Sequence, residues 1–148
     1  MAKFLPQCSI VGDLTEALTY FVASSGITIT KGNAVVLTGG YVENHNGTVA
    51  DRLLGVVAET VTGTSASLEV GVYCDPNIIY HNDADGDLTI DDVGKVFRVT
   101  AGGTQIDEST ATSESSTQFV LIKRDPDGNG DASTGWFKPY VTLLGGAL

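Results

Sequence analysis

Short apolar segments separated by turn residues run through the whole chain. They span residues 27–37, 53–59, 67–73, 94–101, 118–124 and 136–144. Their lengths, their β-branched residues and the Gly, Asn and Asp between them are typical of strands joined by tight turns. The pattern predicts an all-β fold, a compact β-barrel or β-sandwich of at least six short strands with long loops and extended terminal arms.

Two connections stand out between these segments. Asn46-Gly47 lies between the first two predicted strands and predicts a hairpin, because a type I′ turn needs positive φ at both central residues. Residues 101–118 read AGGTQIDESTATSESSTQ and hold almost no large apolar side chains. We therefore expect this stretch to stay outside the core as one long loop.

Residues 12–23, GDLTEALTYFVA, fit two kinds of element. A helix is possible because Asp13 can cap it and Glu16 follows three residues later. A strand is favoured instead, since the side chains alternate from Leu18 to Val22 and Tyr-Phe-Val prefers extended backbone.

The length of 148 residues fits one domain with a core of its own. We predict an N-terminal arm and first strand over residues 1–26, followed by a single β-rich domain over 27–148. In that domain, residues 75–148 form either an elaboration of the barrel or a second lobe.

Both ends of the chain are unusually apolar. Chain ends of this kind are expected to dock on something, and a neighbouring subunit is a natural candidate. The predicted interface residues of these arms, toward another subunit or a capsid, are Phe4, Leu5, Ile10, Val11, Tyr140, Leu143 and Leu144.

Charge narrows the choice of partners. The chain has 8 Lys and Arg against 18 Asp and Glu, a net charge of −10, and 12 of the acids lie in residues 75–148. Such a surface repels phosphate backbones and anionic lipid, so neither nucleic acid nor membrane is expected as a partner. No apolar run approaches the ~18 residues that a membrane span needs. The two cysteines, Cys8 and Cys74, lie far apart and are expected to be buried free thiols.

Two acidic stretches resemble calcium loops. HNDADGDLTIDD begins at His81, and DPDGNGDASTGW begins at Asp125. Each lacks one ligand of an EF-hand loop, because His81 stands at position 1 of the first and Trp136 at position 12 of the second. Plain turns are favoured over weak calcium binding, and no other cofactor is expected. The candidate ligands are Asp83, Asp85, Asp87, Asp92, Asp125, Asp127, Asn129 and Asp131.

Signals for catalysis are weak, and we expect no enzyme. GTSAS at 63–67 departs from the nucleophile-elbow pattern, with Ser67 in place of its second glycine. His45 and His81 are the only histidines, and they lie in a predicted hairpin tip and an acidic turn. Trp136-Phe137 could stack on a sugar, although aromatic residues that open a strand more often serve a core or an interface.

The order of three motifs in residues 27–73 resembles the small β-rich capsid cement, or head decoration, proteins of tailed bacteriophages. In that family a K-G-[ND]-x-V strand precedes a hydrophobic-G-V-A strand and a short V-x-V-G type strand. The matching residues here are Lys31, Gly32, Asn33 and Val35, then Leu54, Gly55, Val56 and Ala58, and finally Val70 and Gly71.

The resemblance implies a protein that binds and stabilises the outside of an icosahedral capsid, commonly as a homotrimer. Its partners would be the major capsid protein and other copies of itself, and it would assemble onto the virion in the host cytoplasm. Two alternatives stay open. One is another virion part, such as a head fibre base or a tail component, and the other is a calcium-dependent carbohydrate-binding module.

Overall fold

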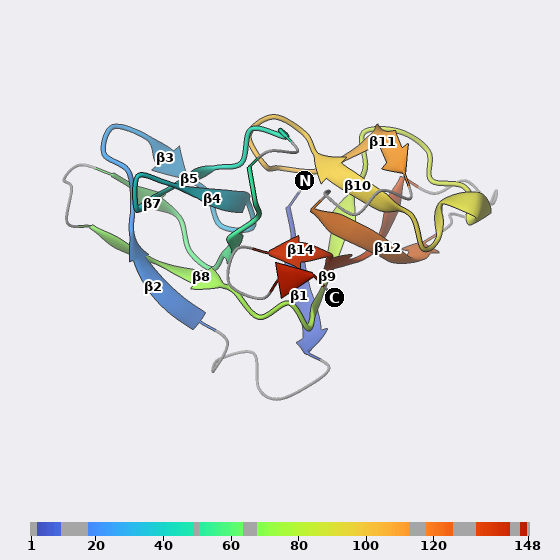
Figure 1. Cartoon of the computed structure of the whole chain (residues 1–148), viewed down its shortest axis with the longest axis horizontal. Coiled ribbons are helices and arrows are strands. Elements are labelled where there is room, and N and C mark those ends of the chain that lie inside the picture. Colours follow the sequence, from blue (N-terminus) through green and yellow to red (C-terminus); the bar gives the residue numbers. More distant parts are fainter. Residues whose placement is uncertain are drawn as a thin grey trace.

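The protein, seen in a computed structural model, consists of two antiparallel β-sheets that lie next to one another along the long axis (Figure 1). The structure describes residues 3–9, 18–48, 51–63, 68–112, 118–125, 133–142 and 146–147. In these ranges the only helical element is one 3-10 turn, η2 (Ile90–Asp92), and no helix is long and apolar enough to cross a membrane. The prediction of an all-β fold is confirmed.

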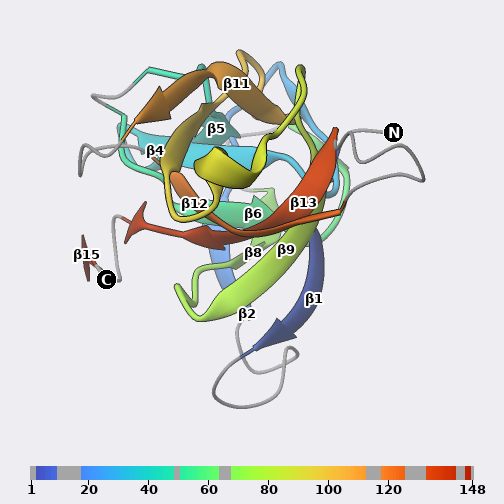
Figure 2. The same ribbon diagram turned by 90° about the vertical axis from the view of Figure 1, so that its right-hand side faces the viewer.

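The first sheet, called the large sheet, has six strands. Figure 2 shows how they fan out from β11 to β1. In spatial order they are β1 (Leu5–Ser9), β9 (Ile78–Asp83), β13 (Thr134–Pro139), β12 (Phe119–Asp125), β10 (Val96–Val99) and β11 (Ile106–Thr112).

The second sheet, called the small sheet, has five strands and comes entirely from residues 18–73. In spatial order they are β2 (Leu18–Val22), β8 (Glu69–Tyr73), β6 (Gly55–Val57), β4 (Ala34–Thr38) and β5 (Tyr41–Asn44). Two short ribbons complete the fold, β3 (Thr28–Ile29) with β7 (Val61–Thr62) and β14 (Val141–Thr142) with β15 (Gly146–Ala147).

Both sheets curl until distant strands touch. In the small sheet a single parallel bridge joins Ala23, just after β2, to Val42 in β5. In the large sheet a similar bridge joins Ala84, just after β9, to Ile106 in β11. Among the described strands neither curl becomes a closed barrel.

The apolar runs of the sequence are explained by strands buried on both faces. Neighbouring residues of the small sheet enter different clusters: Val56 joins a core shared with the large sheet, whereas Val57 joins a core of the small sheet alone. A strand buried on both faces needs apolar side chains at every position, so alternation is lost. The shared core consists of Phe4, Ala34, Leu53, Val56, Ile78, Tyr80, Ala84, Leu88, Phe97, Val99, Ile106, Phe119, Leu121 and Phe137.

Backbone contacts also tie the two sheets together. The Ala34 N–H donates to the Gly103 carbonyl at 2.8 Å, and a Cβ on Gly103 would collide with the Ala34 carbonyl. The buried Gln118 side chain accepts a hydrogen bond from the Val99 N–H at 3.1 Å and donates to the Thr48 carbonyl at 3.5 Å. The large sheet is thus fastened to the loop that follows β5.

The hairpin predicted at Asn46-Gly47 is wrong in its position. The tight turn lies at Gly39 and Gly40, whose φ angles are +57° and +90°, and it joins β4 to β5. Among the described residues only glycines have positive φ, so Asn46 does not meet the requirement of a type I′ turn. Its side chain instead accepts a hydrogen bond from the Thr48 N–H at 2.8 Å.

The long loop predicted over residues 101–118 is also wrong in part, because β11 occupies residues 106–112. This strand pairs with β10 at the edge of the large sheet, through an irregular register. Its first residue, Ile106, is fully buried, while the residues at 107–111 are partly or fully exposed. An edge strand needs few apolar side chains, which is why its sequence looks like a loop.

Candidate functional site

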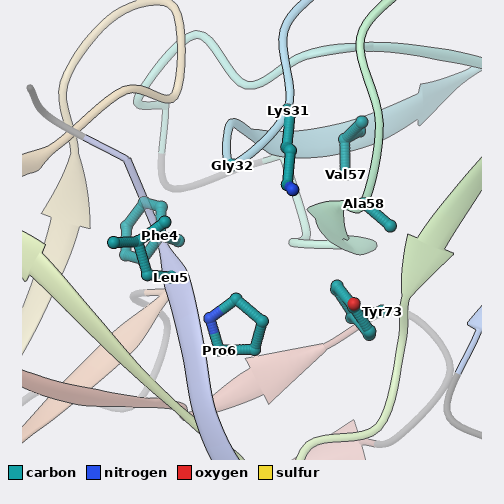
Figure 3. A pocket seen from close by; sticks show the side chains of 8 residues that line it. All are labelled: Phe4, Leu5, Pro6, Lys31, Gly32, Val57, Ala58 and Tyr73. Carbon is teal, nitrogen blue, oxygen red and sulfur yellow. The ribbon is translucent and has the colours of Figure 1, made fainter. Parts of the chain in front are cut away.

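A pocket of about 250 Å³ opens at the seam between β1 and the small sheet (Figure 3). We call it the Lys31 pocket. The start of β1 forms one side, and the turn before β4 and the strands β6 and β8 form the other. Its lining residues are Phe4, Leu5, Pro6, Lys31, Gly32, Val57, Ala58 and Tyr73.

The K-G-N motif builds the wall of this pocket. The Asn33 N–H donates to the Thr30 carbonyl at 3.0 Å, which closes a tight turn around Lys31 and Gly32. Gly32 has a φ of +87°, a conformation that L side chains rarely adopt. Its N–H donates to the Val57 carbonyl and its carbonyl accepts from the Phe4 N–H, both at 2.8 Å. Gly32 therefore links β6 to the start of β1.

The glycine of the second motif, Gly55, is required by a close backbone contact. A Cβ on Gly55 would collide with the carbonyl of Tyr73, so β6 can approach β8 this closely only with glycine at that position. Tyr73 lines the Lys31 pocket next to Ala58. The glycine of the second motif thus brings two walls of the pocket together.

Among the described residues that line this pocket, Lys31 is the only charged one. Its side chain extends into the opening between Phe4 and Ala58, and Tyr73 lies below it (Figure 3). The Lys31 N–H donates to the Thr60 hydroxyl at 3.0 Å, which fixes the backbone that carries the amine. Within the described part of the chain no carboxylate lies within 4.0 Å of the Lys31 amine. The pocket therefore combines apolar walls with one unpaired cation.

A row of side chains crosses the outer face of the large sheet. Strand register aligns Leu5, His81, Trp136 and Lys123 on β1, β9, β13 and β12. The His81 ring centroid lies 4.9 Å from that of Trp136, and the Lys123 amine lies 5.0 Å from it. The half-buried indole therefore contacts side chains from both neighbouring strands. Phe137, the other half of the predicted platform, is fully buried in the shared core.

A shallower hollow lies on the large sheet beside η2. Ile90, Val93 and Ile122 line it at 67%, 40% and 43% exposure. Lys123 and Arg124 form its remaining border. Three of the seven exposed large hydrophobic residues in the described chain therefore gather at one place.

Two of the candidate calcium ligands, Asp92 and Asp85, accept hydrogen bonds from neighbouring residues. Asp92 accepts hydrogen bonds from the N–H and hydroxyl of Thr89 and from Lys95, at 2.8 to 3.2 Å. Burial alone would raise the pKa of Asp92, but these hydrogen bonds outweigh it and hold the pKa below its usual value. Asp85 accepts from the Glu108 N–H at 2.8 Å.

The remaining candidate ligands do not converge either. Asp83 belongs to β9, Asp87 is exposed, and Asp125 lies 3.4 Å from His81. Among the described residues no three His, Cys, Asp or Glu side chains are grouped as a metal would require. Asp127, Asn129 and Asp131 lie outside the described residues.

His45 is buried and hydrogen-bonds to the backbone through both ring nitrogens. Its ring is fully buried, Nδ1 accepts a hydrogen bond from the Gly47 N–H at 2.9 Å, and Nε2 lies 2.8 Å from the Asp51 carbonyl. The imidazole is therefore neutral, with its proton on Nε2, and burial lowers its pKa below 6.5. Both nitrogens hold the loop after β5 and neither is free for proton transfer.

Cys74 is a free thiol, half-buried against the core of the small sheet. Burial raises the pKa of Cys74 to about 12, so the thiolate is scarce at neutral pH. The side chain of Cys8 is not among those described.

The structure corrects one predicted arm residue, Phe4. Its ring is fully buried in the shared core, where it stacks on Phe119 at 4.3 Å and meets Tyr80 edge-on. An aromatic ring near a chain end gives no sequence signal that separates its own core from a neighbour's surface. Leu5, by contrast, is 43% exposed.

For the other arm residues, the interface with another subunit or a capsid stays a prediction. Tyr140 is half-buried and its N–H donates to the Gln118 carbonyl at 2.8 Å. Ile10, Val11, Leu143 and Leu144 lie outside the described residues. The sequence singled out Lys31 only as part of a motif and gave no sign of a pocket, since β1 and β6 are far apart in the chain.

The chain was compared with protein-family models and with curated proteins, and neither comparison gave a match.

Proposed function

We propose that this protein is a non-enzymatic structural component of a virion that binds the outer surface of an icosahedral capsid and stabilises it. Its partners are the major capsid protein and other copies of itself, arranged as a homotrimer. It joins the capsid in the host cytoplasm and remains on the outer surface of the virion.

One observation carries this proposal. Residues 27–73, on which the resemblance to capsid cement proteins rests, bring their motifs into one structural unit. Ala34, which follows the first motif's Asn33, pairs with Val56 of the second motif. Val57 of the second strand pairs with Val72, next to Gly71 of the third motif. Motifs separated in sequence thus lie on adjacent strands, which supports a common architecture over a chance match of short patterns.

Charge supports an outward-facing position. The net charge of −10 disfavours the DNA-facing interior of a capsid and suits a surface in contact with solvent. His45 is itself unsuited to catalysis, because it uses both ring nitrogens to hold its own loop.

The proposal is tested by mixing the purified protein with expanded capsids that were assembled without it. Sedimentation of the capsids should carry the protein down in a saturable amount, a fixed ratio to the major capsid protein. Unassembled capsid protein and an unrelated acidic protein serve as controls. The proposal fails if the protein stays in the supernatant even when the capsids are in large excess.

A further inference from the structure

We propose that the Lys31 pocket receives a segment of the major capsid protein, which inserts an apolar side chain and sets a carboxylate against the Lys31 amine. This inference rests on the proposed function and names the surface through which that function is exerted.

The size of the pocket fits one anchoring side chain. Its volume of about 250 Å³ falls below the ~300–1,000 Å³ that is typical of small-molecule sites. Binding energy in protein interfaces concentrates in a few side chains that fill such pockets. Leu5, Pro6 and Tyr73 are among the lining residues with exposed apolar surface, and they supply the walls for the anchor.

The charge of the pocket determines the chemistry of the partner. In the part of the chain that the structure describes, Lys31 is the only charged residue of the lining, and no acid lies within 4.0 Å of its amine. A carboxylate brought in by the partner would pair with this amine while the anchor excludes water. The Coulomb attraction within such a pair is stronger than at an exposed surface, and it offsets the desolvation of the two charges.

Backbone hydrogen bonds hold the walls of the pocket before any partner arrives. Lys31 projects from a turn whose backbone is held by Thr60, Thr30 and Val57 at 3.0, 3.0 and 2.8 Å. The opposite wall begins with Phe4, which is fixed in the shared core. A receptor that needs no ordering on binding keeps more of the contact energy as affinity.

The test uses four variants in the capsid sedimentation assay. Lys31→Glu should weaken binding by about tenfold or more, since it sets like charges against each other. Lys31→Arg should retain binding. Ala58→Phe fills the pocket without changing charge and should weaken binding to a similar degree. Arg52→Glu makes the same charge change at an exposed residue outside the pocket and serves as the matched control, with unchanged binding expected.

The outcomes separate the two proposals. Failure of the unmodified protein to bind capsids refutes the proposed function. Normal binding by the unmodified protein, Lys31→Glu and Ala58→Phe alike, with melting temperatures showing all three folded, overturns the pocket proposal alone. It is also overturned if Lys31→Glu dissociates a homo-oligomer in the absence of capsids, because the occupant would then be a second copy. Tight binding of phenylacetate that leaves capsid binding unchanged would reassign the pocket to a free acid.

Discussion

Single glycines fix the backbone where β1, β6 and β8 meet, and Gly32 has two separate reasons to be glycine. Its φ is +87°, and a Cβ placed on it would lie 2.7 Å from the Cβ of Lys3. Gly26 offers a comparison, since its φ is +81° but nothing lies within 4 Å of its Cβ position. The left-handed conformation and the close contact can therefore be examined separately.

Gly32→Ala should destabilise the protein more than Gly26→Ala. Both variants incur the left-handed conformation, which costs about 1–2 kcal/mol for a side chain with a Cβ. Only Gly32→Ala must also displace the chain at Lys3. The free energy of unfolding in urea measures both effects. Equal losses in the two variants would show that the contact with Lys3 yields without cost.

His45 should make stability depend on pH below about 6.5. Its pKa in the folded protein lies below the unfolded value of 6.5, so the unfolded chain binds more protons in that window. Stability is therefore complete above pH 6.5 and is lost as the pH falls toward the folded pKa, by up to ~1.4 kcal/mol per pH unit. Urea unfolding between pH 5 and 8 measures the slope.

His45→Gln provides the comparison for this slope. The variant should lose the component of the pH dependence that belongs to the imidazole, whatever its overall stability. If the free energy of unfolding depends on pH in the same way in both proteins, the assignment of a neutral His45 with two hydrogen bonds is contradicted.

At the scale of elements, β1 is part of the fold. It pairs with β9 over four residue pairs and follows directly on Phe4, which is fully buried. Phe4→Ala should therefore cost ~3–5 kcal/mol of unfolding free energy, as expected for a large aromatic ring removed from a core. Leu5→Ala, at a 43% exposed position in the same strand, should cost far less. Similar small losses of unfolding free energy in both variants would show that Phe4 belongs to a loosely attached arm and not to the core.

The sequence predicted the strands with the longest apolar runs, but it missed β9, whose Ile78 and Tyr80 are buried and whose acidic end resembles a calcium loop. All six apolar segments contain strands, and the stretch from Leu18 to Val22 is a strand as favoured. β11 was missed because an edge strand tolerates Asp, Ser and Thr. The hairpin was misplaced because Asn-Gly is a stronger general signal than Gly-Gly, although Gly39 and Gly40 meet the same φ requirement.

The candidate site was harder to predict than the fold. Lys31 and Tyr73 come together only through the pairing of β6 with β8 and the contact of β1 with Gly32. No periodicity in the sequence encodes such long-range pairing. The acidic stretches were candidate calcium sites because their Asp and Gly spacing resembles a calcium loop. In the structure, Asp92 and Asp85 instead accept hydrogen bonds from backbone N–H groups.

At the scale of the whole molecule, the two sheets should unfold together. Ala34, Leu53 and Val56 come from the small-sheet half of the chain but join the shared core with Phe97 and Phe119. Urea transitions followed through Trp136 fluorescence and through the amide signals of the small sheet should have the same midpoint. Two separate midpoints would mean that the sheets are independent domains.

The central claim, that this protein stabilises a capsid from outside, is tested most directly by heating. Capsids assembled without the protein are heated with and without a saturating amount of it, and the temperature of capsid disruption is measured. A protein that binds only the intact capsid stabilises it by mass action, so the proposed function predicts a rise that grows with occupancy and stops at saturation. An unchanged disruption temperature on fully occupied capsids would contradict it.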